Sequence, residues 1–407
     1  MDRISEIVCA VLRESLCGEA FDEICPQADK LDDQTKNSVC TELKMHGVLC
    51  LADKWLTKHP LQDLTMYESW RKQSRDQQIR LMYALSAQQN ALKVLKENGV
   101  DAVVIKGAAA AVYYPDPFLR VMGDIDLFVK REDLARAAEA LESNGFIHED
   151  ASLDEEHHLC YRKFGLLFEL HRRLPIVDEN NEELLNFFEK GIDERITETI
   201  ECISFPMLPH RLNGIVLLFH INQHLRVGLG LRQITDWMEF VDKHIDNEAW
   251  EKEYREVLEK LSLDKFAKTV TEMCRLYLGL RREITWCEGV DVSVCDSFFE
   301  YIIKKGTFGI KAGEEGRVAS AFLRSTNPFK IIARLQKKGL AGWEAANKHR
   351  ILRPFAWIYQ FKEERKRLKR SNMTLKKLKS LKDEGLRERA LIEAIGLDAD
   401  RTIYERD

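Results

Sequence analysis

The spacing of apolar residues predicts helices toward both ends of the chain and a short segment of alternating strands and helices near residue 100. Apolar residues at three- and four-residue intervals predict a long amphipathic helix over residues 76–98, and Asn98-Gly99 ends it. The continuous apolar run at 102–105 has the length of a strand, and a strand-turn-helix unit over 101–114 accounts for it. A second strand is expected at 124–129, and a helix at 131–143 that stops at Asn144-Gly145.

The pattern then predicts a hairpin with strands at 159–164 and 166–171 and a turn at Gly165. From residue 182 to about 280 the periodicity is helical again, and no internal repeat is present. The expected fold is α+β, with a small mixed-sheet core flanked by helical regions. We expect four regions: an N-terminal helical region (1–95), an α/β core (96–175), a helical domain that packs over the cleft (176–310) and a basic helical C-terminal region (311–407).

Two carboxylates separated by one residue, Asp124 and Asp126, lie within an apolar run. In a strand they project to the same face, because side chains alternate between the two faces. Adjacent carboxylates repel each other and are costly to bury unless a cation lies between them. A hard cation such as Mg²⁺ binds carboxylate and phosphate oxygens together. The pair is therefore a candidate metal clamp for a nucleoside triphosphate, although Asp-x-Asp alone is more often a solvated strand end or turn.

Lys106-Gly107 follows the first predicted strand, and a stretch of small residues that begins at Ala108 comes next. Backbone N–H groups at a helix start bind phosphate, and glycine lets a ligand approach the backbone closely. Lys106 adds a positive charge at the same place. A phosphate cradle followed by a metal clamp indicates a nucleotide site.

Lys106-Gly107, Arg120 and the run Gly123-Asp124-Ile125-Asp126 resemble the signature of the polymerase-beta-type nucleotidyltransferase superfamily. The chain resembles more closely its bacterial branch, the nucleotidyltransferase family proteins, and is similar to toxin-type nucleotidyltransferases of abortive-infection systems. The motifs cover about residues 96–175, and weaker similarity extends to about residue 242. The resemblance implies an NTP such as ATP as substrate, Mg²⁺ or Mn²⁺ as cofactor, and Asp124 and Asp126 as catalytic metal ligands. It also implies that Lys106, Gly107, Ala108 and Gly123 bind the nucleotide.

The superfamily pattern requires a third carboxylate between apolar residues on a neighbouring strand, and Glu169 between Phe168 and Leu170 matches it. The resemblance implies a third catalytic and metal-binding residue there, acting either as general base or in positioning the metal. Alone, Glu169 would be interpreted as an exposed strand residue. His171 shares its strand face and is either an accessory proton acceptor, a base-stacking group or a structural histidine.

Several other residues have two interpretations each. Arg120 either neutralises phosphate charge or forms a structural ion pair. Arg232 and Asp236 are four residues apart on a predicted helix, where they form either a helical ion pair or an accessory pair over the cleft, with Arg232 on a phosphate. Ala108 departs from the superfamily, which often has serine or glycine there, so the nucleotide pose is in doubt. His220 and His224 have zinc-ligand spacing, but no third ligand is evident, and a structural role is favoured.

Composition fits a cytoplasmic enzyme. Of the 407 residues 45% are apolar, and no run approaches the eighteen apolar residues of a transmembrane span. The N-terminus lacks the basic region and the apolar core of a signal peptide. The ten cysteines are scattered without a Cys-x-x-Cys pair, which favours reduced thiols over zinc ribbons or a disulfide framework.

The C-terminal region differs electrostatically from the rest. Residues 324–382 contain eighteen Lys and Arg and three acidic residues, a net charge of +15 in a chain whose net charge is −5. Such asymmetry indicates a surface for a polyanion such as RNA or an anionic membrane, and the aromatic run at 354–359 suits base stacking or a lipid interface. The alternatives are a protein partner or a solvated helix whose aromatic residues dock on the protein.

The sequence therefore predicts a Mg²⁺-dependent nucleotidyltransferase that moves an NMP from an NTP to a hydroxyl acceptor and releases pyrophosphate. The acceptor is a small molecule, a protein or an RNA. Two other functions are also consistent with the pattern. One is a catalytically silent nucleotide-binding or regulatory module, which Ala108 favours. The other is a toxin-type enzyme acting on tRNA, which the basic C-terminal region favours.

Overall fold

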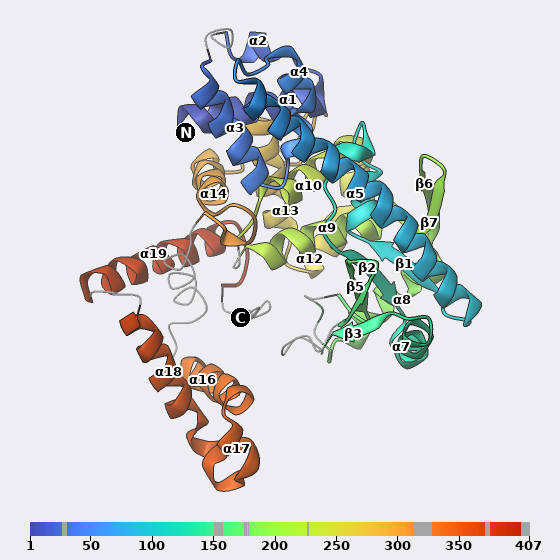
Figure 1. Cartoon of the computed structure of the whole chain (residues 1–407), viewed down its shortest axis with the longest axis vertical. Helices are drawn as coiled ribbons and strands as arrows, with labels where there is room; N and C mark the ends of the chain where they lie inside the picture. Colours follow the sequence, from blue (N-terminus) through green and yellow to red (C-terminus); the bar gives the residue numbers. More distant parts are fainter. Residues whose placement is uncertain are drawn as a thin grey trace. The chain divides into compact units, whose positions relative to one another are not determined.

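The computed structural model describes residues 1–26, 31–149, 158–174, 177, 179–225, 228–311, 328–370 and 375–399 (Figure 1). The chain divides into a larger unit, Met1–Lys311, and a C-terminal unit, Ala312–Thr402. The larger unit is built on one mixed sheet with flanking helices, so the predicted α+β class is confirmed. The finer division into four regions remains a prediction.

The sheet of the larger unit has seven described strands in the order β3-β4-β5-β2-β1-β7-β6. Their bounds are β1 Ala102–Ile105, β2 Ile125–Val129, β3 Ile147–Glu149, β4 His158–Lys163, β5 Leu166–His171, β6 Ile196–Ile200 and β7 Ile203–Met207. β1 and β2 are antiparallel, whereas β2 and β5 are parallel. In this register Ile105 pairs with Asp126 and Asp126 pairs with Glu169, so the predicted carboxylates of two strands lie side by side.

The predicted hairpin is confirmed as β4 and β5. Phe164 and Gly165 connect the strands, and both have positive φ, 56° and 73°. Two consecutive residues of positive φ make the kind of two-residue turn that matches the right-handed twist of paired strands. The hairpin fixes which residues of β4 stand opposite those of β5.

The prediction that the chain is helical from residue 182 onward is wrong for β6 and β7, which form a hairpin at one edge of the sheet. Along β6 half-buried residues alternate with exposed ones, which is the strand period. The two strands are five residues each and stand between helices, so the helical periodicity of their neighbours dominates a longer window. β3 was not predicted either. The long helix begins at Leu64 rather than at 76, and the helix after β1 ends at Ala111.

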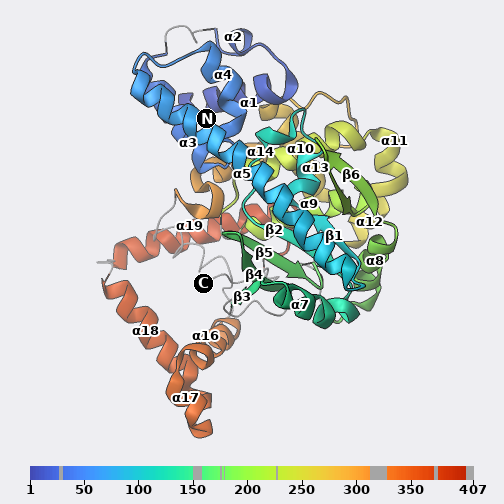
Figure 2. The same ribbon diagram turned by 45° about the vertical axis from the view of Figure 1, so that its right-hand side comes forward.

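Helices cover the sheet. In the larger unit they are α1 Arg3–Cys17, α2 Phe21–Ile24, α3 Asp33–Met45, η2 Leu49–Ala52, α4 Asp53–Lys58, α5 Leu64–Glu97, α6 Gly107–Ala111, η3 Pro117–Leu119, η4 Arg131–Asp133, α7 Leu134–Ser143, α8 Glu182–Asp193, α9 His210–His224, α10 Leu231–His244, α11 Asn247–Ala249, η5 Trp250–Tyr254, α12 Arg255–Lys260, α13 Asp264–Met273, η6 Cys274–Leu278, α14 Val292–Lys305 and η7 Thr307–Gly309. α5 runs along the sheet and packs on β1, β7 and α7 (Figures 1 and 2). The neighbours of the two carboxylates, Ile125 and Leu127 on β2 and Phe168 and Leu170 on β5, point to the opposite face of the sheet, because strand residues alternate between faces.

Two helices, α9 and α10, pack against each other, and α10 contacts α6 directly after β1. α9 is buried on all sides from Leu212 to Asn222, which is typical of a helix in the core of a large domain. α6 consists of a glycine and four fully buried alanines. Small side chains let its backbone lie close to its neighbours, and Asn213 Nδ2 donates a hydrogen bond to the Ala109 carbonyl over 2.8 Å. α6, α9 and α10 therefore form one packed layer beside the end of β1.

A buried carboxyl on α10 leads to a prediction about stability. Glu239 is buried, its Oε2 has no hydrogen-bond partner, and burial raises its pKa to about 8, which Asp242 reinforces. The folded protein therefore holds Glu239 neutral at pH 7, whereas the unfolded chain ionises this carboxyl above pH 4.5. The free energy of unfolding consequently falls as the pH rises from 4.5 toward 8. We expect Glu239→Gln to remove this loss and to stabilise the protein by a few kcal/mol at pH 8.5, at about 1.4 kcal/mol per pKa unit. Urea unfolding at pH 5 and 8.5 measures it, and the exposed Glu248→Gln variant is the control. Equal pH dependence of Glu239→Gln and the parent would contradict the assignment.

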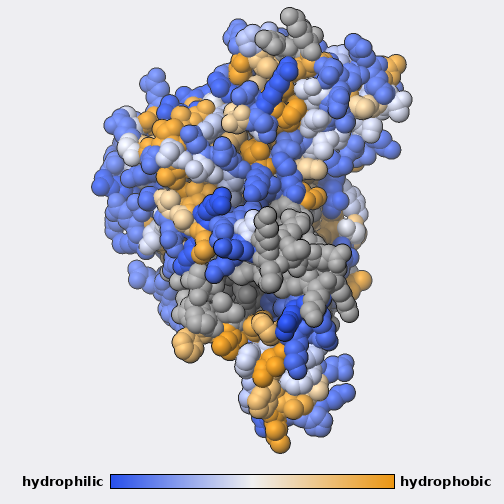
Figure 3. All heavy atoms as spheres, turned by 90° about the vertical axis from the view of Figure 1, so that its left-hand side faces the viewer, coloured by the Kyte–Doolittle hydropathy of each residue, from blue (hydrophilic) through white to orange (hydrophobic). Residues whose placement is uncertain are grey.

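The C-terminal unit is helical in its described part, with α16 Pro328–Gly342, α17 Glu344–Lys348, η8 Arg350–Phe355, α18 Ala356–Arg370 and α19 Leu375–Ala394. α16 packs against α18, and the rings of Trp343 and Tyr359 stack at 5.1 Å between centroids. Phe329 and Ile351 are 80% and 85% exposed, and apolar and polar side chains adjoin on the surface of this unit (Figure 3). Within the predicted aromatic run Phe355 is 52% exposed, whereas Trp357 and Tyr359 are half-buried.

No helix in the described part of the chain is long and apolar enough to span a membrane. All ten cysteines are free, as the scattered spacing predicts.

Candidate functional site

The site begins where β1 ends, at Lys106 and Gly107. Lys106 has φ 55° and ψ −136°, and Gly107 has φ 27°. A positive φ is strained for a residue with a side chain, and such strain often lies at a functional position. The tight turn directs the buried Lys106 side chain toward β2, where Nζ donates a hydrogen bond to Asp126 Oδ1 over 2.8 Å. The predicted phosphate ligand is therefore paired with a predicted metal ligand.

Asp126 is the centre of the cluster. It is 3% exposed, and Oδ1 accepts hydrogen bonds from Lys106 Nζ and from His171 Nε2, each at 2.8 Å. Burial alone raises the pKa of Asp126, but the charges of Lys106 and His171 outweigh burial and hold it below its ordinary value. Burial likewise opposes the charge of Lys106, whose pKa nevertheless lies above the ordinary value because of Asp126, Glu169 and Asp124. The pair therefore stays ionised at neutral pH.

Asp124 lies one residue before β2, at a bend, rather than inside the strand as predicted. It is half-buried. Burial raises its pKa, and the neighbouring charges of Asp126 and Glu169 raise it further. Asp124 and Asp126 thus repel each other, as their spacing in the sequence predicts, and Glu169 adds to this repulsion. A site that concentrates carboxylate oxygens with this repulsion fits a hard divalent cation.

Glu169 and His171 lie on β5 and face Asp126. His171 Nε2 is 3.3 Å from Glu169 Oε2, and the two side chains are 1% and 4% exposed, so Glu169 is not an exposed strand residue. Burial opposes the charge of Glu169, yet His171 and Lys106 hold its pKa well below the ordinary value. Burial also opposes protonation of His171, but the hydrogen bonds to Asp126 and Glu169 raise its pKa. Glu169 and Asp126 thus favour the protonated form of His171, and His171 and Lys106 favour the ionised form of Glu169.

Arg120 and Asp236 form a second buried network. Arg120 Nε and Nη2 donate to the two oxygens of Asp236 over 3.1 and 2.8 Å, and the Tyr114 hydroxyl donates to Asp236 Oδ1 over 2.8 Å. A bidentate ion pair of this kind holds both side chains in a fixed geometry. The structure agrees with a structural ion pair for Arg120, and its contact with a nucleotide remains a prediction. Asp236 pairs with Arg120 and not with Arg232.

Arg232 stands beside this network at the start of α10. Its Nη1 donates to the Val121 carbonyl over 3.5 Å, and its buried Nε has no hydrogen-bond partner. Burial lowers the pKa of Arg232, and the charge of Arg120 lowers it further, while Asp124 and Asp236 oppose this. Asp124 and Arg232 therefore attract each other. Arg232 lies on the side of the cluster where Asp124 precedes β2.

The remaining predicted residues lie around the same strand ends. Gly123 is exposed, directly before Asp124, and a side chain there would meet nothing within 4 Å. Ala108 is fully buried in α6. The rings of His220 and His224 lie 4.7 Å apart, and in the described chain they belong to no group of three candidate metal ligands. Burial and the charges of Lys106, Arg120, Arg232 and His224 keep the pKa of His220 well below its ordinary value.

Two participants were not predicted from the sequence. His158 begins β4 and is buried, with Nε2 4.0 Å from Glu169 Oε1, and Tyr114 joins Arg120 and Asp236. His158 pairs with His171 across the hairpin, and that pairing follows only from the register of the two strands. Tyr114 reaches a residue 122 positions later in the chain. The one local sequence signal for His158 is that His158, Cys160 and Arg162 stand at every second position and so share one face of the strand.

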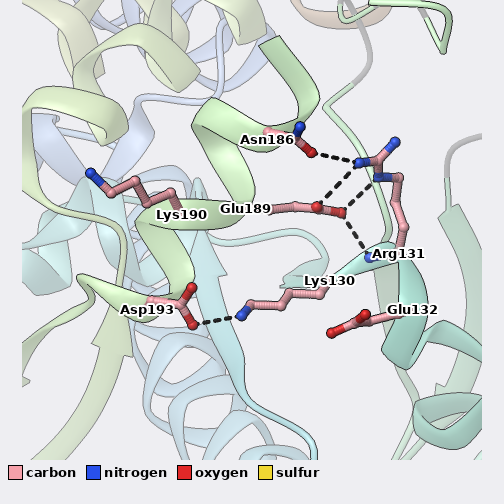
Figure 4. Close-up of a pocket in the computed structure, with 7 residues that line it drawn as sticks. All are labelled: Lys130, Arg131, Glu132, Asn186, Glu189, Lys190 and Asp193. Atoms are coloured by element: carbon pink, nitrogen blue, oxygen red, sulfur yellow. Dashed lines mark hydrogen bonds and ion pairs between the residues drawn. The ribbon is translucent and has the colours of Figure 1, made fainter. Parts of the chain in front are cut away.

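A surface pocket lies at the opposite end of β2, between η4 and α8 (Figure 4). Its charged side chains bind one another: Lys130 pairs with Asp193 at 2.6 Å, and Arg131 Nε pairs with Glu189 at 2.8 Å. The pocket contains none of the predicted site residues, which lie where β2 begins. We therefore assign the candidate site to the Lys106–Asp126–Glu169 cluster.

One comparison with known proteins identifies a family. Residues 33–279 match the family described as uncharacterised nucleotidyltransferase. Among solved structures, an antigenic nucleotidyltransferase-like protein from Paracoccidioides brasiliensis is similar at 18% identity and a TM-score of 0.32, over 49% of this chain and 93% of that one. No curated protein matches significantly. Because the family match spans more than half of the chain and contains every predicted site residue, the chain belongs to this uncharacterised nucleotidyltransferase family.

Proposed function

We propose that the protein is a Mg²⁺-dependent nucleotidyltransferase that transfers an NMP from an NTP, such as ATP, to a hydroxyl acceptor. The observation that carries the proposal is the meeting of side chains from three neighbouring strands. Lys106 directly follows β1, β2 contributes Asp126 with Asp124 just before it, and β5 contributes Glu169. A buried cluster of three carboxylates and one lysine, reached by a strained turn, suits phosphate and metal chemistry rather than a structural role.

The donor set fits the metal. Asp124 and Asp126 would hold Mg²⁺ or Mn²⁺, with Glu169 as third ligand, and the ion would relieve the repulsion that raises the pKa of Asp124. Bound there, the metal supplies positive charge for the phosphate oxygens. The Lys106 ammonium lies on Asp126 and offers its charge to the triphosphate as well. Gly107 and Gly123 leave the backbone accessible, and Arg232 offers a cation near Asp124.

The reaction is an in-line displacement. The acceptor hydroxyl oxygen forms a bond to the α-phosphorus, the bond to the bridging oxygen breaks, and pyrophosphate leaves with that electron pair. The chain contributes mainly by positioning and by neutralising charge. Glu169 is ionised and, with its low pKa, is a weak base, so metal positioning is the better of its two candidate roles. The proton of the acceptor hydroxyl passes to solvent.

Glu169 is expected to serve turnover more than nucleotide affinity. Glu169→Gln keeps the shape of the side chain and removes its charge, so we expect NTP binding within a few fold of the parent and transfer lower by roughly 10²-fold or more. Calorimetric NTP titration and transfer of α-labelled NMP measure the two effects. The same substitution at the exposed Glu97, which should change neither, is the matched control. If NTP binding is lost and transfer falls only in proportion, Glu169 is a binding residue instead.

The acceptor and partner remain part of the proposal, with a small molecule, a protein and an RNA as the classes. The basic C-terminal unit favours RNA, because phosphate contacts supply most non-specific affinity. Arg365 and Lys366 on α18 are exposed. We expect reversal of both charges to weaken tRNA binding and to reduce its dependence on salt by about one unit of log–log slope per lost contact. Filter binding from low to high salt measures it, against reversal of the exposed Lys252 and Arg255. Equal binding by parent and variant would remove the support for an RNA acceptor.

A further inference from the structure

We propose that His158, Glu169 and His171 form a binding site for a divalent transition-metal cation, best matched by Zn²⁺. The site adds to the proposed function and shares Glu169 with it. Its evidence is the donor chemistry of the β4–β5 hairpin and does not depend on nucleotide transfer.

The hairpin register brings the three residues together. β4 and β5 are antiparallel, and His158 stands directly opposite His171. Glu169 is two residues before His171 on the same strand, so its side chain projects from the same face of the sheet. Two imidazoles and one carboxylate therefore converge on one buried position.

The distances suit one ion. His158 Nε2 is 4.0 Å from Glu169 Oε1, and His171 Nε2 is 3.3 Å from Glu169 Oε2. One ligand atom from each residue can be chosen so that all three lie within 4.8 Å of one another. Donors about 2.0–2.1 Å from a tetrahedral zinc lie roughly 3.4 Å apart. The ring centroids of His158 and His171 are 5.0 Å apart, so metal binding would draw the His158 ring toward the other two donors.

The donor types determine the metal class. Mg²⁺ prefers oxygen ligands and retains water, whereas imidazole nitrogen suits zinc and other late first-row metals. Two histidines with one glutamate is an open three-ligand zinc set, which leaves a fourth position for water or substrate. His171 directs Nε2 into the cluster, while its buried Nδ1 has no hydrogen-bond partner. Nε2 is therefore the ligating atom, and it exchanges its contact with Asp126 for the metal.

The test uses the full chain freed of metal by a chelator and titrated with Co²⁺, whose visible absorption reports four-coordinate geometry. We expect one Co²⁺ per chain, displaced by Zn²⁺ and not by an equal concentration of Mg²⁺. His158→Asn and His171→Asn should each weaken Co²⁺ binding by roughly 10²-fold or more, at least as much as loss of an outer-shell partner costs. His148→Asn, the same substitution at an exposed position on β3, and Cys202→Ser, at an exposed thiol, should bind as the parent does.

Two outcomes overturn the proposal: no Co²⁺ binding by the parent, or unchanged binding by both histidine variants. Should a variant fold poorly, the parent and His148→Asn still decide the matter, because Zn²⁺ must raise the thermal unfolding midpoint of both. Asp124→Asn keeps the three ligands and separates this inference from the proposed function. It should bind Co²⁺ normally, and if it also retains Mg²⁺-dependent NTP binding, the proposed function fails while the transition-metal site stands.

Discussion

Asp124→Asn is expected to stabilise the protein and at the same time to abolish its metal-dependent NTP binding. The raised pKa of Asp124, caused by burial and then by Asp126 and Glu169, means that its charge is unfavourable in the folded state. Removing that charge should raise the free energy of unfolding at pH 7. It should lower the affinity for Mg²⁺ with NTP by roughly 10²-fold or more, because a ligand is lost rather than an outer-shell partner. A carboxylate whose removal stabilises the fold but weakens metal binding is typical of a metal site.

The pH dependence of the free energy of unfolding shows whether the Asp124 charge destabilises the folded protein. A carboxyl whose pKa is raised on folding destabilises only where the unfolded chain ionises it, so parent and variant should be equally stable below pH 3.8 and diverge as pH rises. Urea unfolding across this range, with calorimetric titration of Mg²⁺ and ATP, measures both effects. Asp76→Asn, at an exposed position on α5, is the matched control. A less stable Asp124→Asn protein that still binds Mg²⁺ and ATP would reverse the interpretation.

Breaking the buried pair of Arg120 and Asp236 is expected to have the largest effect on stability. Their bidentate contact is nearly inaccessible to solvent, with 3% and 1% of the side chains exposed. Arg120→Ala leaves the Asp236 carboxylate without its cation and should cost about 3–5 kcal/mol. Arg120→Met combined with Asp236→Leu removes both charges and should recover much of this loss, because no charge is then buried alone.

Urea unfolding of Arg120→Met, Asp236→Leu and the double variant gives the coupling energy of the pair. Arg13→Ala breaks the half-exposed pair with Glu19 and should cost less than about 1 kcal/mol. Additive effects at Arg120 and Asp236 would show that the pair does not act as a unit. If Arg120 variants that remain folded also lose NTP affinity, the predicted nucleotide contact of Arg120 gains its first support.

Local pattern is sufficient to locate the strands that carry the candidate site. Asp126 and Glu169 each stand between apolar residues in a short strand, so alternation alone gives their face, and Lys106-Gly107 marks the end of β1. The hairpin turn at Gly165 is also predictable from the local sequence, because this glycine separates two strand-like runs. By contrast, the β6–β7 hairpin lies between helices and has partly exposed strands, so it carries little apolar contrast.

The contacts within the site depend on tertiary structure. That Lys106 pairs with Asp126 requires the antiparallel register of β1 and β2, and that His158 meets Glu169 requires the register of β4 and β5. Arg120 and Asp236 are 116 residues apart in the chain, so no sequence window contains both. One of the two interpretations open from the sequence pairs Asp236 with its near neighbour Arg232, whereas in the structure Asp236 pairs with Arg120.

The central claim is tested most directly by following label from two forms of one NTP. The full chain is incubated with Mg²⁺, a cell extract and each NTP, labelled either at the α-phosphate or at the γ-phosphate, beside Asp124→Asn as the inactive control. A nucleotidyltransferase should transfer the α-label to an acceptor and release the γ-label as pyrophosphate, only in the parent. Transfer of the γ-label, or equal α-label transfer by parent and Asp124→Asn, would contradict the account.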